Sequence, residues 1–78
     1  MNALKLIKRM ERADQLIRLK ATGTPKMLAN RLEISERNLF YLIDMMKELG
    51  APVYYCRRRG SYCYESEVKF KFGFFQPV

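Results

Sequence analysis

Apolar residues recur at helical spacing over the first twenty residues of the chain. From Ala3 to Lys20 they fall at steps of three and four, while charged residues occupy much of the remaining surface. Residues 21–23, with the sequence Ala-Thr-Gly, then interrupt this pattern. We therefore predict a first helix over residues 3–20. Its apolar face comprises Leu6, Met10, Ala13, Leu16 and Ile17, with Lys20 at its end.

A second, shorter helix is predicted after this interruption. Thr24 can accept a hydrogen bond from an unpaired backbone amide, and Pro25 needs no N–H at the first helical position. The helix is therefore expected from Pro25 to Leu32, and residues 33–35 interrupt it as a tight turn. Its apolar side comprises Leu28, Ala29 and Leu32.

The signals for a third helix come directly after the turn. Ser35 is a suitable N-cap, and Glu36 places negative charge in the first helical turn. The helix is predicted from Glu36 to about Leu49, because Gly50 suits a left-handed C-terminal position and Pro52 prevents a restart. Its apolar stripe comprises Leu39, Ile43, Met46 and Leu49, with Leu42 as an alternative to one of them.

After Pro52 the period becomes that of a strand. Residues 53–57 and 61–65 are rich in tyrosine and other β-formers, and a glycine-containing turn separates the two runs. We therefore predict a β-hairpin. If residues 59 and 60 form a two-residue turn, Cys56 faces Cys63 across it.

The C-terminal residues alternate even more strictly. From Val68 to Phe74, valine and phenylalanines occupy one face and lysines the other, which is typical of a half-buried strand. So many aromatic residues either complete the core or form a subunit interface, because an exposed row would favour aggregation. We therefore divide the chain into a domain of residues 1–66 and a C-terminal strand or tail of residues 67–78. The phenylalanines are Phe70, Phe72, Phe74 and Phe75.

Length and charge narrow the class of protein. The 78 residues allow one small domain, and 15 basic against 8 acidic residues give a formal charge of +7. Such a field favours polyanions, either nucleic acid or an anionic membrane surface, although a basic surface can also serve solubility alone. No apolar run approaches the roughly 20 residues of a membrane span. The N-terminus lacks the features of a secretory signal. We expect a cytoplasmic protein without a membrane partner.

The residue inventory offers little for catalysis or for metal binding. The chain has two cysteines and no histidine, whereas a structural zinc site usually needs four such ligands. It also lacks a glycine-rich phosphate loop and a nucleophile with a plausible base. We therefore expect no enzyme activity, metal, cofactor or small-molecule substrate. In a reducing compartment Cys56 and Cys63 are expected to be free and inert, with a redox switch as the less favoured alternative.

Two short helices joined by a tight turn indicate a helix-turn-helix, whose second helix can enter the DNA major groove. Arginine can bond bidentately to guanine and asparagine to adenine. An arginine-rich hairpin turn beside such a helix suits phosphates or a minor groove. The candidate DNA-binding residues are Thr24, Lys26, Ser35, Glu36, Arg37, Asn38, Tyr41, Arg57, Arg58 and Arg59.

Each of these residues has an ordinary structural alternative. Arg37 and Asn38 equally suit a solvated first helical turn, and residues 57–59 suit a solubilising hairpin tip. The tyrosines of the hairpin are expected in the sheet and core, with base stacking on single-stranded nucleic acid as a weaker alternative.

Three motifs, in order, resemble a known family. They are LANRLEISERNL from Leu28, KELGAPVYY from Lys47 and RRRGSYCY from Arg57. Together they are similar to the N-terminal winged-helix domain of bacterial DeoR-like and WYL-domain transcription regulators. The resemblance covers roughly two thirds of the chain and implies three helices, a β wing and DNA binding.

The chain also departs from the family pattern. Asn38 stands where the family commonly has threonine, and Tyr41 and Leu42 stand where it often has a basic and an acidic residue. Glu33 occupies a turn position that the family often gives to glycine, which predicts backbone strain there if φ is positive.

The combined prediction is a mainly helical winged helix-turn-helix, with three helices followed by a β wing. We expect it to bind double-stranded DNA as a homodimer in transcription regulation. The alternative is a winged-helix module for protein–protein interaction or dimerisation without direct DNA contact. Tyr41 and Leu42 motivate this alternative.

Overall fold

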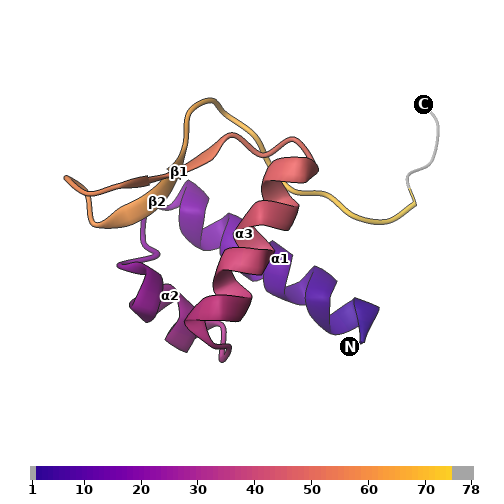
Figure 1. Ribbon diagram of the computed structural model, residues 1–78. Coiled ribbons are helices and arrows are strands. Elements are labelled where there is room, and N and C mark those ends of the chain that lie inside the picture. The colour runs from indigo at the N-terminus through magenta and orange to yellow at the C-terminus, as the bar shows by residue number, and fades with distance from the viewer. Residues whose placement is uncertain (1, 75–78) are drawn as a thin grey trace.

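Three helices and an antiparallel hairpin make up the computed structural model of the chain, which describes residues 2–74 (Figure 1). In Figure 1, α3 crosses in front of α1, while α2 and the hairpin lie to the left of this crossing. The predicted order of elements is confirmed. The elements are α1 (Ala3–Arg18), α2 (Pro25–Arg31), α3 (Glu36–Glu48), β1 (Val53–Cys56) and β2 (Ser61–Tyr64).

Side-chain caps begin each helix. The Asn2 side chain accepts a hydrogen bond from the Leu4 amide at the start of α1. Thr24 accepts from the Met27 amide at 3.2 Å, and Ser35 accepts from the Asn38 amide at 3.1 Å. The caps predicted for α2 and α3 are therefore confirmed. Each satisfies one of the amides that a helix start leaves without a partner.

The first helix is two residues shorter than predicted. Lys20 adopts a left-handed conformation with φ of +55°, and the Ala21 amide donates to the Leu16 carbonyl at 2.9 Å. This bond closes the last turn and directs the chain away from the helix axis. Lys20 is consequently exposed and does not extend the apolar face. Among the described residues, no helix is long and apolar enough to cross a membrane.

The core lies where the three helices and the hairpin meet. α2 packs against α3, β2 packs against α1, and β1 packs against α3. The choice left open in α3 is settled in favour of Leu42, which is buried, whereas Leu49 is largely exposed. The buried apolar residues of the helices are Met10, Ala13, Ile17, Leu28, Ala29, Leu32, Leu39, Leu42, Ile43 and Met46.

The predicted hairpin register is wrong. Tyr55 pairs with Tyr62 and Cys56 with Ser61, so a four-residue turn over residues 57–60 replaces the two-residue turn. Cys56 therefore does not face Cys63, and both thiols are free. Side chains that are directly opposite share a face of a hairpin. The observed register puts Tyr55 on the face of buried Tyr62, whereas the predicted one would put an arginine there.

The predicted C-terminal strand does not form within the described residues. The Glu65 amide donates to the Pro52 carbonyl at 2.9 Å, and the chain then bends at residues 65–66, away from β1. Alternate side chains instead pack on helices. Phe70 contacts the core, whereas Phe72 and Phe74 are exposed. Only Phe70 thus matches the expectation that the phenylalanines complete the core, and Phe75 lies outside the described residues.

Candidate nucleic-acid interface

The turn between α2 and α3 sets the start of α3. The Glu33 amide donates to the Asn30 carbonyl at 3.1 Å, and the Ile34 amide donates to the Ala29 carbonyl at 3.0 Å. Glu33 has a φ of +58°, which confirms the positive φ considered for this position. A non-glycine residue pays a steric cost in this conformation. The turn is therefore held by packing of the two helices on either side of it.

The outward face of α3 begins with an arginine stacked on a tyrosine. Arg37 Nε lies 3.3 Å from the Tyr41 hydroxyl, and the guanidinium carbon lies 5.8 Å from the centroid of the ring. Both side chains are exposed. The two terminal nitrogens of Arg37 have no hydrogen-bond partner among residues 2–74. They remain available for an external acceptor.

The other residues of the first turn of α3 point to different sides. Asn38 borders a shallow pocket between α1 and α3, together with Leu6 and Arg9. Glu36 lies on the hairpin side, close enough to Tyr62 to help raise the pKa of that phenol, after burial and Tyr55. The hydroxyl of Ser35 already accepts the capping bond. Tyr41 borders the same pocket as Asn38, and Arg37 lies over its ring.

The hairpin turn carries three adjacent arginines. Arg57, Arg58 and Arg59 are exposed, and the turn closes through Gly60, which has a φ of +62° and donates to the Arg57 carbonyl at 3.3 Å. Within the described part of the chain, the single ion pair joins Arg18 and Asp14. The positive charge of the turn is therefore not neutralised by a neighbouring carboxylate.

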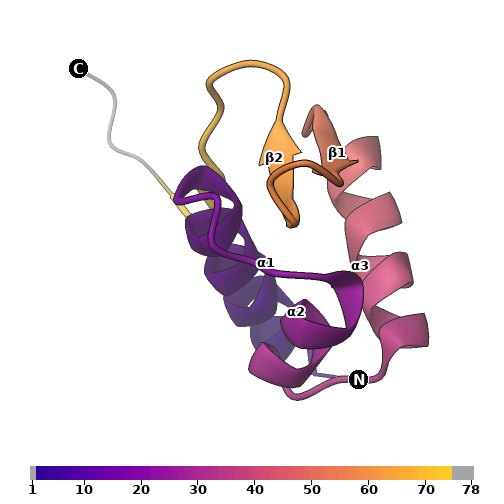
Figure 2. The ribbon, with the colours of Figure 1, turned by 90° about the vertical axis from the view of Figure 1, so that its left-hand side faces the viewer.

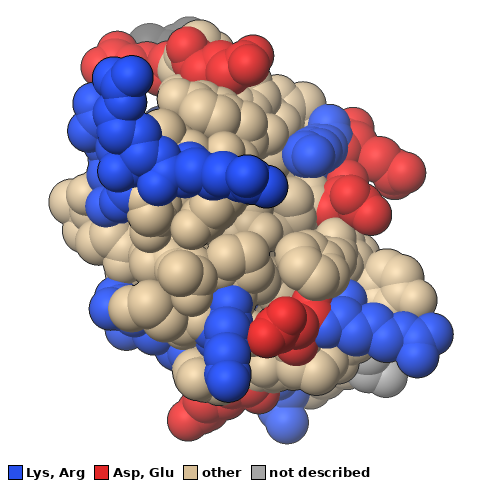
Figure 3. All heavy atoms as spheres, turned by 60° about the vertical axis from the view of Figure 1, so that its left-hand side comes forward, with Lys and Arg blue, Asp and Glu red and all other residues tan. Residues whose placement is uncertain are grey.

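Basic side chains gather unevenly on the hairpin side of the molecule. Figure 3 shows a concentration of lysine and arginine at the upper left of this view and isolated charges around a broad uncharged surface. The remaining two predicted residues, Thr24 and Lys26, lie at the exposed start of α2. Thr24 uses its hydroxyl to cap that helix. In Figure 2 the hairpin turn faces the viewer above α2 and beside α3.

A buried hydroxyl network anchors the hairpin to the loop between α1 and α2. The Tyr62 amide donates to the Thr22 hydroxyl at 2.8 Å, and the Thr22 amide donates to the Ser61 hydroxyl at 3.2 Å. The two hydroxyl oxygens are 3.0 Å apart, and both residues are buried. Sequence analysis missed this network, because it joins residues about forty positions apart. A threonine between an alanine and a glycine carries no signal for it.

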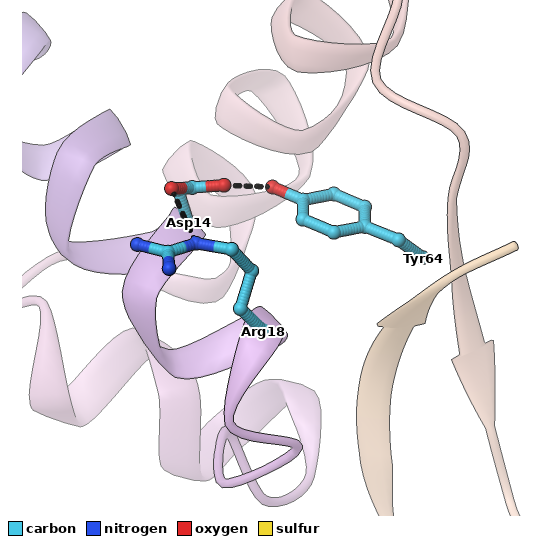
Figure 4. Close-up of polar contacts among 3 residues, drawn as sticks. All are labelled: Asp14, Arg18 and Tyr64. Carbon is cyan, nitrogen blue, oxygen red and sulfur yellow. Dashed lines mark hydrogen bonds and ion pairs between the residues drawn. The ribbon is translucent and has the colours of Figure 1, made fainter. Parts of the chain in front are cut away.

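A second buried polar contact fixes the other end of β2 to α1 (Figure 4). Asp14 is only 1% exposed, and it accepts a hydrogen bond from the Tyr64 hydroxyl at 2.7 Å and one from Arg18 Nε at 3.0 Å. Burial, followed by the bond to Asp14, raises the pKa of Tyr64 well above its usual range. The sequence pattern placed the charged residues of this helix outside its apolar face, and Asp14 is an exception to that expectation. Its position four residues after Met10, on the apolar arc, was the available signal.

The predicted site residues therefore form separate groups on one molecule. Those on α3 and those on the hairpin turn share no hydrogen bond among the described residues. The two buried contacts attach the hairpin to α1 and to the loop that follows it, and so position these groups relative to one another. Of the pair that motivated a protein-interaction role, only Tyr41 is available, because Leu42 is buried.

No protein-family model, curated protein or solved structure matches the chain. The interpretation of its function consequently depends on the motifs of the sequence and on the geometry described above.

Proposed function

We propose that the chain is a winged-helix module that binds double-stranded DNA, with α3 as the recognition helix and the hairpin as the wing. The observation that carries this proposal is the row of three arginines at the hairpin turn, without an acidic partner in the described chain. An exposed, uncompensated arginine cluster attracts phosphates and releases counterions when it binds them. The net charge of +7 acts in the same direction.

The outward face of α3 indicates how the helix would enter the groove. Arg37 and Tyr41 occupy its first half, whereas exposed Asp44 and Glu48 continue the same face at steps of three and four. Carboxylates near phosphates are repelled, so the N-terminal half would enter the major groove. The free terminal nitrogens of Arg37 could then contact a guanine edge, and Asn38 could contact a base or a phosphate on the flank.

The buried contacts of β2 support the wing in this role. Thr22 and Asp14 restrict the hairpin relative to α1, so little conformational freedom of its base would be lost on binding. The arginine side chains at the tip can still adapt to the phosphates. A role in transcription regulation is what the family resemblance implies for such a module.

The experiment is fluorescence anisotropy with a random-sequence DNA duplex over a series of salt concentrations. Each neutralised phosphate contributes about −0.9 to the slope of log K against log salt, so several contacts predict a slope of roughly −3 to −6. Replacing Arg58 and Arg59 by alanine should reduce the magnitude of this slope by about 2. The matched control replaces Lys5 and Lys8 of α1, which removes the same charge elsewhere. Equal effects of the two variants, or no binding at low salt, would contradict the proposal.

A protein-interaction module remains the second candidate. Its support is the exposure of two aromatic side chains: Phe40 is 47% exposed and Tyr41 is 55% exposed. A partner protein would bury these aromatic residues and would tolerate loss of the wing arginines. Replacing Arg58 and Arg59 by alanine separates the two functions, because only DNA binding requires the wing arginines.

A further inference from the structure

The segment after β2 has a strand-like sequence but no strand to pair with. Among the described residues, no backbone hydrogen bond involves residues 66–74. Val68 and Phe70 are half-buried and line an apolar groove with α1 and the end of α3; Lys69 and Lys71 also border this groove but are exposed, as is Glu67. The segment therefore lies flat against the helices and leaves backbone groups along its length unpaired. Unpaired backbone groups of this kind can pair with a strand of another chain.

The charges of this segment are self-complementary about Val68, with acidic residues before it and basic residues after it. Glu65 and Glu67 precede Val68, and Lys69 and Lys71 follow it, all at alternate positions. An antiparallel partner of the same sequence, centred on Val68, places each Glu67 opposite Lys69 and each Glu65 opposite Lys71. Centring on Lys69 or Phe70 instead sets lysine against lysine. Opposite charges stabilise directly facing pairs, and like charges destabilise them.

We propose that this segment, with residues 66–70 at its centre, pairs antiparallel with the same segment of a second copy, with the two-fold axis at Val68. The pairing is isologous, so every contact occurs twice and the assembly closes as a dimer. Val68 and Phe70 keep their half-buried positions on their own helices, because the pairing uses the backbone of the segment and not these side chains. The bend at residues 65–66 ends the ladder, so it spans residues 66–70, in which Glu67 and Lys69 face each other directly while Glu65 and Lys71 flank it.

The pairing surface does not include the hairpin turn, and this turn and residues 70–74 lie at opposite ends of the molecule in Figure 1. This inference thus names a partner and a surface separate from the proposed DNA contact. It does not depend on that contact.

The test exchanges the charges of the exposed side chains. Lys69→Glu with Lys71→Glu makes the segment wholly acidic, and Glu65→Lys with Glu67→Lys makes it wholly basic. By sedimentation equilibrium, we expect the unmodified chain to dimerise. For each variant alone, the dissociation constant of the dimer should rise by about tenfold or more. An equimolar mixture of the two variants should dimerise again, as a heterodimer. A monomeric unmodified chain, unaffected variants or a mixture that stays monomeric would overturn the proposal.

A matched control separates this proposal from DNA binding. Arg58→Glu with Arg59→Glu changes the net charge as much as the acidic tail variant does, but at the hairpin turn. It should retain the dimer and lose DNA binding. If it retains the dimer while no chain binds DNA, only the proposed function fails. If DNA binding is normal and the unmodified chain is monomeric, only the dimer proposal fails.

The register has its own measurement. Val68→Cys, in a chain with Cys56→Ser, should form a disulfide-linked dimer on mild oxidation, because facing Cα atoms on the axis are about 5 Å apart. Phe72→Cys should crosslink much more slowly, since it lies four residues from the axis. Faster crosslinking at position 72 would exclude the axis at Val68.

Discussion

The hairpin and the segment of residues 66–74 contain similar residue types but are held in different ways. In the hairpin, β1 and β2 pair with each other, and β2 donates hydrogen bonds to buried Asp14 and Thr22, which attach it to the helical part. Residues 66–74 make no backbone hydrogen bond among the described residues and are held by apolar contacts of alternate side chains. The difference shows that alternation specifies a surface, whereas a strand also needs a partner edge.

The largest effect should follow from removal of the buried carboxylate at the hairpin base. Asp14→Ala leaves the Tyr64 hydroxyl without its acceptor, so we expect the free energy of unfolding to fall by about 2–3 kcal/mol. Urea denaturation measures this change. The exposed Asp44→Ala should change the stability by less than about 0.5 kcal/mol. In the background of Tyr64→Phe, Asp14→Ala should cost less, and an unchanged cost would exclude coupling between the two residues.

The hydroxyl network at the opposite end of β2 should matter somewhat less. Thr22→Val preserves the shape of the side chain but leaves the Tyr62 amide without its buried acceptor, whereas the Ser61 hydroxyl keeps its bonds to the amide of residue 22 and to the Tyr62 carbonyl. We expect a loss of about 2 kcal/mol. Hydrogen exchange should locate the change in β2 rather than in α3. Equal loss of protection in both elements would contradict a local anchor.

Alkaline pH should weaken the hairpin base without any substitution. The pKa of Tyr64 is raised in the folded protein, so this phenol keeps its proton when the unfolded chain loses it near pH 10. The unfolded state then binds fewer protons, and stability falls as pH rises above about 10, by up to ~1.4 kcal/mol per pH unit. Tyr64→Phe should reduce this slope. A slope that Tyr64→Phe leaves unchanged would assign it to other groups, such as Tyr62.

The C-terminal segment should show a smaller and position-dependent effect. Phe70 is partly buried against the core, so Phe70→Ala should lower the stability of the monomer by about 1 kcal/mol. Phe72→Ala should leave it nearly unchanged, because this side chain is exposed. Thermal unfolding at a low concentration, where a dimer is dissociated, makes this comparison. Similar losses at both positions would show that the segment packs differently.

A residue outside both regions should give the smallest effect, of opposite sign. Glu33 has a positive φ, and glycine adopts this conformation without the steric cost. Glu33→Gly should therefore raise the free energy of unfolding by about 0.5–1 kcal/mol. Glu33→Ala keeps the Cβ and should bring no gain. A gain with alanine would indicate that the charge, rather than the backbone, limits stability.

Much of the helical architecture could be predicted from local signals. Thr24 and Ser35 cap the helices that they were expected to cap, and Gly50 has a positive φ after α3. These features depend on residues within one or two turns, so they can be identified in the sequence. The exposure of the candidate site residues could be predicted for the same reason, and all ten are exposed. Their stacking, capping and grouping were not predicted.

The sequence by itself determined the three helices, the existence of the hairpin, the exposed arginine turn and the self-complementary charges around Val68, because each depends on neighbouring residues. Only the tertiary structure decided the register of the hairpin, the burial of Asp14 and the path of residues 66–74. Register follows from which tyrosines the helices can cover. Asp14 is buried because Tyr64, fifty residues later, supplies its partner. Such long-range contacts depend on which surfaces pack together in the folded chain, so a local sequence pattern cannot predict them.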